Sequence, residues 1–389
     1  MEQPVAAVIC EYNPFHKGHL HQLHEIRNTL PGAIIIGLMS TCFTQRGDPA
    51  LFSPCDRARM ALRSGMDMVF ALPTSVSLSN AQRFAAGGVD LACALGFVTH
   101  LSFGAESSLR ELQQVASLLE NPTEEFQQTL RNALKRGESF PSAQGEAILT
   151  CFRGRLQPNA WTMPNNMLAI EYLRAIIRSG GTIKPLPILR EGSYHKKKLK
   201  RGEAPSAEAI REAFIAGDFA LAQSACPETL PMKPLCLPNA LDRVMLYALR
   251  SKQPEEIASA PDCSEGLENR LYQACRIATT KEELLSGLKT KRYPYARLNR
   301  LCTRLMLDIP AFFPEDGCTW NGAHLLGFRN TAQVRQLLGE SKIPIMTRAQ
   351  ELKQNENMVH YEEKAYDLWA LGAGIPSGML WRQKTIVIE

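Results

Sequence analysis

The chain has 389 residues, 45% of them hydrophobic and 21% charged, with a formal net charge of +5 at pH 7. This is the composition of a globular protein of about two domains, and so mild a charge means that a polyanionic partner must be sought in local clusters. Eleven cysteines without a C-x-x-C pair or regular spacing argue against a zinc site and against a disulfide framework.

The sequence predicts neither a signal peptide in its opening segment nor a membrane-spanning segment. No apolar run approaches the ~20 residues that cross a bilayer, and the opening segment MEQPVAAVIC lacks the basic and long apolar regions of a signal peptide. We therefore expect a cytoplasmic protein that is soluble and contacts no membrane.

The first half of the chain alternates between short apolar runs and helical patterns. The runs predict strands buried on both faces of a parallel sheet, and they lie at residues 5–10, 33–39, 67–72, 100–103 and 183–189. Helices are predicted between them at residues 53–63, 80–95 and 166–177, with an extra helical block at residues 106–152. This alternation indicates an α/β fold with a doubly wound, five-stranded parallel sheet, which binds ligands beyond the carboxyl ends of its strands.

The second half is predicted to be mainly helical. Amphipathic patterns lie at residues 240–249, 267–277, 295–307 and 362–371, with one short apolar run at residues 343–346. We expect two domains, a catalytic one at residues 1–217 and a mainly helical one at residues 218–389.

The first apolar run leads into the segment CEYNPFHKGHLHQLH, in which His16 and His19 flank Gly18. A helix that starts here has unpaired backbone N–H groups and a positive dipole end, and Gly18 lets a phosphate approach the backbone. Imidazoles at positions i and i+3 share one helix face, so both can donate to phosphate oxygens. Two ordinary surface histidines are the alternative, but the preceding strand and following helix favour a phosphate site.

Residues 11–19, which read EYNPFHKGH, carry a resemblance. The first half resembles the HIGH-type nucleotidyltransferase superfamily, and this segment is similar to the bacterial tRNA(Met) cytidine acetate ligase family. That family activates acetate with ATP and acetylates N4 of the wobble cytidine of elongator tRNA(Met). The resemblance thus implies ATP and acetate as substrates and the anticodon region of that tRNA as partner.

Further segments resemble the same family in order along the chain. They include residues 39–50 (MSTCFTQRGDPA), 102–107 (SFGAES), 164–166 (PNN) and 189–190 (LR), and the blocks 291–304, 343–347 and 366–372. One of Asn165 and Asn166 is expected to contact ATP, while the other caps the following helix. The resemblance implies these ATP-binding residues: Cys10, Glu11, Tyr12, Asn13, Pro14, Phe15, His16, Gly18, His19, Gly104, Asn165, Asn166, Arg190, Ser206 and Arg211.

The catalytic residues that we expect are His16, His19 and Arg46. The two imidazoles would stabilise the leaving pyrophosphate with help from Arg190 and Arg211. Arg46 lies in the segment QRGD after the second strand, and its guanidinium suits either a carboxylate or a phosphate. Asp48 is expected either to hold magnesium or to pair with Arg46. No metal-ligand cluster is legible, so Mg²⁺ is expected on the phosphates and its protein ligands stay unassigned.

Two positions depart from the family pattern. Thr41 stands where a glycine is usual, and Glu208 stands where a threonine is usual in the second phosphate motif, PSAEAIR. A carboxylate near a triphosphate would repel it. The alternative is that Ser206 caps a helix and Glu208 complements its dipole.

Two basic segments predict a nucleic-acid surface. Residues 195–201 read HKKKLKR, and residues 289–304 carry six Lys or Arg, two tyrosines and no acid. Arg297, Arg300 and Arg304 recur at helical spacing and so form one face. Basic side chains with aromatic neighbours suit an RNA backbone and unstacked bases, although a solvated surface is the ordinary alternative. The expected RNA-binding residues are Lys196, Lys197, Lys198, Lys200, Arg201, Lys291, Arg292, Arg297, Arg300 and Arg304.

These features favour an ATP-dependent tRNA-modifying ligase over two other classes. A small-molecule adenylyltransferase shares H-x-G-H but leaves the basic helical half without a purpose. A non-catalytic RNA-binding protein with a degenerate nucleotide site fits Thr41 and Glu208. Acetate-dependent release of pyrophosphate, with and without tRNA, distinguishes the three.

Overall fold

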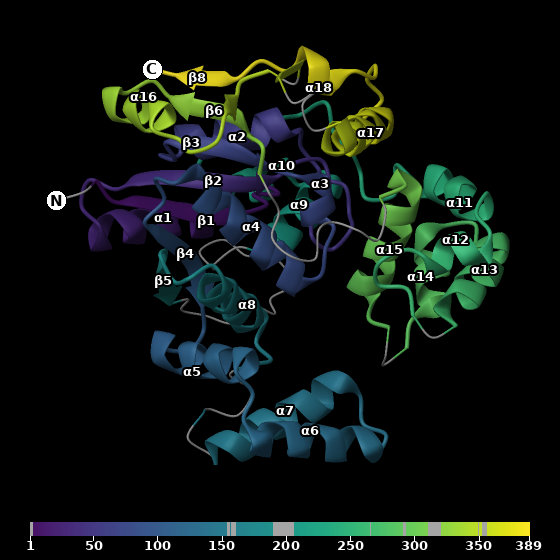
Figure 1. Cartoon of the computed structure of the whole chain (residues 1–389). Helices are drawn as coiled ribbons and strands as arrows, with labels where there is room; N and C mark the ends of the chain where they lie inside the picture. The colour runs from purple at the N-terminus through teal and green to yellow at the C-terminus, as the bar shows by residue number, and fades with distance from the viewer. Residues whose placement is uncertain are drawn as a thin grey trace.

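The computed structural model describes residues 3–153, 156, 161–189, 206–264, 266–290, 293–309, 320–348, 350–351 and 356–389. A twisted sheet with helices on both faces forms its centre, as Figure 1 shows. A helical arm extends from one side of the sheet, and a helical bundle lies beyond the carboxyl ends of the first strands. No helix among the described residues has both the length and the apolar character that crossing a membrane requires.

Eight strands of the described residues form the sheet. The first five pair in parallel, so the predicted strands and their direction are confirmed. In spatial order the strands are β5 (Lys184–Leu189), β4 (His100–Ala105), β1 (Val5–Cys10), β2 (Ile34–Ser40), β3 (Met68–Leu72), β6 (Ala323–Arg329) and β7 (Ile345–Met346), and β8 (Ile386–Ile388) pairs with β6.

The end of the chain returns to this sheet, which corrects the expected count of five strands. β6 runs antiparallel to β3 with Val69 opposite Gly327, and β7 and β8 both pair with β6. Without β6, β3 would be an open edge in a sheet that is covered on both faces. Three strands of the half that was expected to be mainly helical thus belong to the same sheet as the first five.

Alternate residues of each strand point to opposite faces, and each face has its own apolar core. On one face, β1 packs against α1 (Lys17–Thr29), α2 (Pro54–Arg63) and α9 (Ala207–Ile215). On the other it faces α4 (Ala81–Leu95), α8 (Pro164–Arg178) and α16 (Ala332–Gly339). Helices on both faces confirm the doubly wound α/β fold.

Local sequence signals fix the ends of these helices. Ser53 caps α2 by accepting from the backbone N–H of Asp56, and Pro54 occupies its first position. Asn80 caps α4 in the same way, and α4 ends at Gly96 with a positive φ of 83°.

The predicted helical block before the last parallel strand is confirmed as three helices, α5 (Leu109–Glu120), α6 (Glu124–Lys135) and α7 (Phe140–Phe152). α5 packs on α8, and α6 and α7 form a hairpin that extends away from the sheet (Figure 1).

The bundle consists of short helices around its own apolar core. Its core also includes Cys42 and Phe43 from the loop after β2, and Trp369 from α17 (Glu356–Gly372). α15 is the bundle helix that lies nearest the sheet in Figure 1. The helices of the bundle are α11 (Asp242–Arg250), α12 (Pro254–Ala258), α13 (Leu267–Ile277), α14 (Lys281–Leu288) and α15 (Tyr295–Leu307). α10 (Phe219–Ser224) packs instead on α9, at one face of the sheet.

Candidate active site at the carboxyl edge of the sheet

The strand order reverses between β1 and β4, and the predicted site residues gather at the carboxyl ends of these strands. In an open α/β sheet, ligands bind outside such a reversal point. α1 follows β1 directly, and its Gln22 side chain donates to Ser102 Oγ on β4 at 3.2 Å. The start of α1 therefore lies at the crevice between the two strands.

The two histidines cap α1 reciprocally. His16 Nδ1 accepts from the backbone N–H of Gly18 at 3.0 Å, and His19 Nδ1 accepts from the backbone N–H of His16 at 3.2 Å. Their rings stack with centroids 3.7 Å apart. Because each Nδ1 is an acceptor, each neutral ring carries its proton on Nε2. His16 is 3% exposed, so the alternative of two ordinary surface histidines does not fit.

The first backbone N–H groups of α1 were expected to be unpaired, but they are hydrogen-bonded within the protein. Lys17 N–H donates to Ala225 O at 3.0 Å, and the next two N–H groups bond to the ring and the carbonyl of His16. These groups are thus engaged within the protein, and the donors left to the site are those of side chains. The positive end of the helix dipole remains, and the first turn contains no acidic residue.

The segment before His16 is a tight turn built by buried side chains. Tyr12 has a φ of +47°, and the peptide bond between Asn13 and Pro14 is cis. Tyr12 and Phe15 both lie against the ring of His19, with centroids 4.7 and 5.5 Å away. Asn13 Oδ1 accepts from the N–H of Leu51 at 2.9 Å. These side chains hold the imidazoles in place.

Cys10 and Glu11 stand at the carboxyl end of β1. Burial raises the pKa of the Cys10 thiol, which keeps it protonated. Glu11 Oε1 accepts from the N–H of Gln45 at 2.6 Å. Burial also raises the pKa of Glu11, although that hydrogen bond and the charges of Arg211, Arg57 and Arg46 act in the opposite direction.

α9 brings Arg211 to the same turn. Its Nη1 donates to Asn13 O at 2.6 Å, and burial lowers its pKa. Ser206 caps α9 by accepting from Ala209 N–H at 3.1 Å, and Glu208 is exposed in the first turn. This geometry is that of the capping alternative for both residues.

The loop after β2 carries the expected QRGD residues. Arg46 is the exposed member, while Gly47 is buried and Gln45 and Asp48 are half-buried. Asp48 Oδ1 accepts from Lys281 Nζ and from Asn299 Nδ2, both at 2.9 Å. The expected pairing of Asp48 with Arg46 is therefore wrong, because the bundle supplies the partners of Asp48.

At the end of β4, Asn166 and Asn165 have different surroundings. Asn166 is 0% exposed, and its Oδ1 accepts from the N–H groups of Glu106 at 2.7 Å and Ser107 at 3.2 Å. It thus holds the β4–α5 connection. Asn165 is half-buried and donates to the Glu106 side chain. Gly104, in β4 itself, is half-buried beside them. Asn165 is the one of the pair with exposed surface.

Thr41 and Arg57 are buried at the carboxyl ends of β1 and β2. Thr41 is 1% exposed, and its hydroxyl donates to Glu362 Oε2 of α17 at 3.1 Å. Arg57, which the sequence did not single out, is 0% exposed and donates to the carbonyls of Glu11, Ser40 and Thr41. It thereby joins the carboxyl ends of β1 and β2. Its position on the otherwise apolar face of α2 was the available signal.

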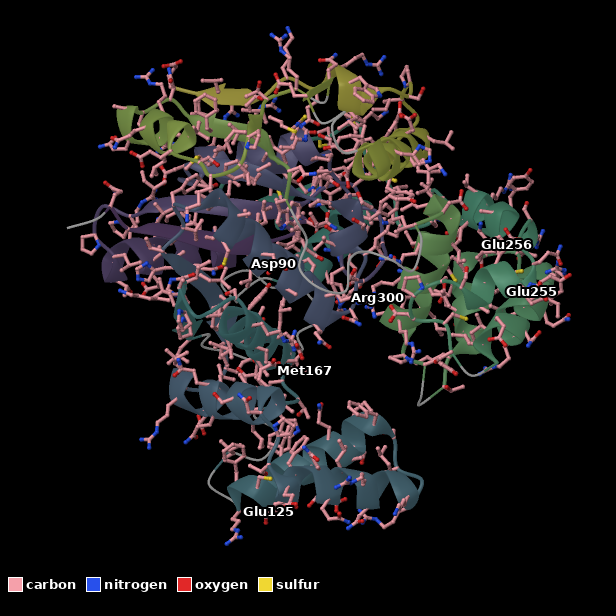
Figure 2. All side chains as sticks on the ribbon, viewed as in Figure 1. Asp90, Glu125, Met167, Glu255, Glu256 and Arg300 are labelled. Atoms are coloured by element: carbon pink, nitrogen blue, oxygen red, sulfur yellow. The ribbon has the colours of Figure 1, made fainter. Side chains whose placement is uncertain are left out.

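The expected RNA-binding face of α15 is not exposed. Arg300 and Arg304 are 8% and 2% exposed, and Arg304 Nη1 donates to the carbonyls of Ser75 and Leu78. Arg297 donates to Asp262 O and to Ser264 within the bundle. Figure 2 shows Arg300 on the side of the bundle turned toward the sheet. Burial of Arg300 and Arg304 corrects the expectation that these two side chains contact RNA, while Arg297 is half-buried and its RNA contact stays a prediction.

Several predicted residues lie outside the described part of the chain. They are Arg190, Lys196, Lys197, Lys198, Lys200, Arg201, Lys291 and Arg292. Among the residues that the structure does describe, no three His, Cys, Asp or Glu side chains gather as a metal site.

Comparison with known proteins gives consistent matches over almost the whole chain. The HIGH Nucleotidyl Transferase family model matches residues 3–377. The tRNA(Met) cytidine acetate ligase of Alkaliphilus metalliredigens is 32% identical, with 94% of each chain covered. That of Clostridium kluyveri is 33% identical, with 91% of each covered.

Solved structures give the same result. Thermotoga maritima TmcAL, in a crystal structure with alpha-thio ATP, has a TM-score of 0.87 and 26% identity, covering 99% of this chain and 100% of that one. The apo form of the same protein has a TM-score of 0.88 and 27% identity over the same shares.

Proposed function

This chain belongs to the HIGH nucleotidyl transferase family and, within it, to the tRNA(Met) cytidine acetate ligases, and from this premise we propose its reaction. It uses ATP to activate acetate and transfers the acetyl group to N4 of the wobble cytidine of elongator tRNA(Met). The observation that carries the proposal is the stacked, mutually capping pair His16 and His19 at the start of α1.

The reaction has two steps. A carboxylate oxygen of acetate attacks the α-phosphorus of ATP, the bond from that phosphorus to the β-bridging oxygen breaks, and pyrophosphate leaves. The cytidine N4 amine then attacks the acetyl carbon, AMP leaves, and the amine loses a proton. Neither step needs a protein nucleophile, so the protein must supply alignment and charge stabilisation.

The site residues supply that stabilisation in a consistent arrangement. Capping fixes the proton of each imidazole on Nε2, and these N–H groups donate to phosphate oxygens as charge shifts toward the pyrophosphate. Arg211, and Arg190, which follows Leu189 in the sequence, add positive charge. Asn165 contacts the nucleotide, since Asn166 is occupied with the β4–α5 connection.

Arg46 and Mg²⁺ complete the proposed chemistry. The exposed guanidinium of Arg46 is suited to hold the acetate carboxylate in two-point fashion. We assign Mg²⁺ to the phosphate oxygens of ATP, where it would neutralise charge. Asp48, the carboxylate considered for it, already accepts from Lys281 and Asn299.

For tRNA we propose the basic segment 195–201 as the contact segment, because it combines five Lys or Arg in seven residues and stands in the sequence between β5 and α9. The arginines of α15 are not included, because they make hydrogen bonds within the protein.

Pyrophosphate release tests the proposal. Purified protein with ATP should release pyrophosphate when acetate and bulk tRNA are both present, and much less when either is omitted. Release that depends on a small-molecule acceptor and ignores acetate would instead indicate a cofactor-building adenylyltransferase.

A further inference from the structure

We propose that α15 positions Arg46 for the acid substrate, with Asn299 as the positioning residue. The inference rests on the proposed function, because it assigns Arg46 to acetate. It gives the helical bundle a part in the activation of acetate, before any tRNA is present.

α15 holds the loop of Arg46 through consecutive carbonyls. Asn299 Nδ2 donates to Arg46 O at 2.9 Å, and Thr303 Oγ1 donates to Gly47 O at 2.8 Å. Arg300 makes a weak third contact of 3.5 Å to Gln45 O. Asn299 and Thr303 are four residues apart and so lie on one side of the helix. Both are 0% exposed, and these bonds are therefore shielded from water.

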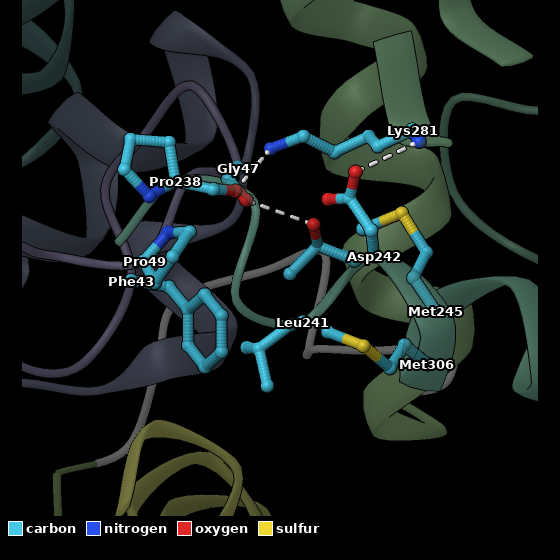
Figure 3. A pocket seen from close by; sticks show the side chains of 10 residues that line it. Phe43, Gly47, Pro49, Pro238, Leu241, Asp242, Met245, Lys281 and Met306 are labelled. Carbon is cyan, nitrogen blue, oxygen red and sulfur yellow. Dashed lines mark hydrogen bonds between the residues drawn. The ribbon is translucent and has the colours of Figure 1, made fainter. Parts of the chain in front are cut away.

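Close packing also ties the loop to the helix. Gly47 has a φ of +90°, and a Cβ there would lie 2.8 Å from the backbone nitrogen of Arg300. Only glycine permits this approach, because both the conformation and the space exclude a side chain. Figure 3 shows Gly47, Phe43 and Pro49 facing Lys281 and Asp242 of the bundle across a small cavity.

The loop is fastened on both sides of Arg46. On the sheet side, Glu11 accepts from Gln45 N–H at the end of β1. On the bundle side, Asp48 Oδ1 accepts from Lys281 and Asn299. The loop on either side of Arg46 is thus anchored to the end of β1 and to the bundle.

Among the residues that the structure describes, Asn299 alone bonds both the carbonyl of Arg46 and the carboxylate of Asp48. Its loss frees the loop on either side of Gly47 at once. A guanidinium that must grip a carboxylate loses much of its effect when displaced by about 1 Å, which can cost about 100-fold in rate. A residue that only stabilises the bundle would not act through Arg46.

A double-mutant cycle tests this inference. The variants are Asn299→Leu, which keeps the number and branching of the side-chain heavy atoms but removes the donor, Arg46→Ala, and their combination. The assay is acetate-dependent exchange of pyrophosphate into ATP without tRNA, with the Kd for ATP measured by calorimetry. We expect Asn299→Leu to lower kcat/KM for acetate by about 10- to 100-fold with the Kd unchanged, and to have little further effect when Arg46 is already alanine.

Arg250→Ala is the matched control. Arg250 also donates two hydrogen bonds to carbonyls, those of Cys275 and Ala278, but it does so within the bundle. Its loss should leave the kinetics unchanged. A second readout is trypsin, which should cleave after Arg46 faster in Asn299→Leu than in the control.

The outcomes distinguish a failure of the positioning role from a failure of the proposed function. Independent, multiplicative losses, an unaltered kcat/KM, or equal losses in Arg250→Ala would overturn the positioning role. Wild-type protein that binds ATP yet performs no acetate-dependent exchange would overturn the proposed function as well.

Discussion

Each imidazole at the start of α1 uses its two nitrogens for different purposes. Nδ1 accepts a backbone N–H and so closes the first turn of the helix, which sets both the ring orientation and the tautomer. Nε2 then carries the proton that a phosphate oxygen can accept. A variant that separates these two purposes distinguishes a chemical role from a capping role.

His19→Asn makes that separation. The asparagine oxygen can replace Nδ1 as acceptor for His16 N–H, but the side chain is too short to replace the Nε2 donor. We expect the melting temperature to stay within about 2 °C of the wild type, while acetate-dependent pyrophosphate exchange falls about 100-fold. His19→Ala serves as the comparison, because it should lose both stability and activity. Retained activity in His19→Asn would reduce the residue to a cap.

The sequence indicated most residues at the start of α1, because their spacing and their place between a strand and a helix are local features. It did not indicate Arg57 or distinguish Asn165 from Asn166, because burial depends on elements distant in sequence. Asn166 bonds to the backbone of Glu106 and Ser107, some sixty positions earlier. No local pattern reports such a contact.

At the scale of elements, periodicity predicted the helix α15 correctly. It did not predict that the arginines of this helix contact the loops of the sheet, where we had expected RNA. Leu298, Leu301 and Leu305 indicate a helix with one apolar face. Every residue from 298 to 307 is nevertheless buried, since the polar side of the helix docks on the loops of the sheet. A row of arginines on a helix has the same sequence pattern whether it meets RNA or backbone carbonyls.

His324 in β6 makes the stability of the folded protein depend on pH. Burial lowers the pKa of His324 to about 4, despite the opposing charge of Glu351, and Glu362 of α17 lines the same cavity. Above its ordinary pKa of 6.5 the residue is neutral in both states and contributes nothing. As the pH falls from 6.5 toward 4, the unfolded chain binds a proton that the folded chain excludes, and stability is lost.

His324→Gln removes this dependence. Between pH 7 and pH 5, the wild type should lose about 2 kcal/mol more of its free energy of unfolding than the variant, as measured by urea denaturation. Comparing the two proteins cancels the carboxylates that both contain. Parallel losses in the two proteins would mean that His324 is protonated in the folded state near its ordinary pKa.

At the scale of the whole molecule, the sheet is built from both ends of the chain. The five parallel strands and their order of appearance followed from alternating apolar runs. β6 could not be predicted in this way, because it pairs with β3 from some 250 positions later. β7 and β8 have two and three residues, too few to show a period. The chain thus leaves the sheet after β5, forms the bundle, and returns to the sheet with β6, β7 and β8.

This topology makes the candidate site a shared one. The sheet contributes the start of α1, and the bundle fixes the loop of Arg46 through α15 and Lys281. Under the proposed function, nucleotide and acid would meet where the two parts of the molecule touch, and the acceptor cytidine would have to be brought to the same edge.

Nucleoside analysis of tRNA tests the central claim most directly. Elongator tRNA(Met) that lacks the modification is incubated with the protein, ATP and isotopically labelled acetate, then digested and analysed by mass spectrometry. The account predicts one labelled N4-acetylcytidine per molecule, at the wobble position, and none without ATP or with His19→Asn. The account would be contradicted if labelled acetylcytidine formed without ATP. It would also be contradicted if ATP were turned over while the tRNA stayed unmodified.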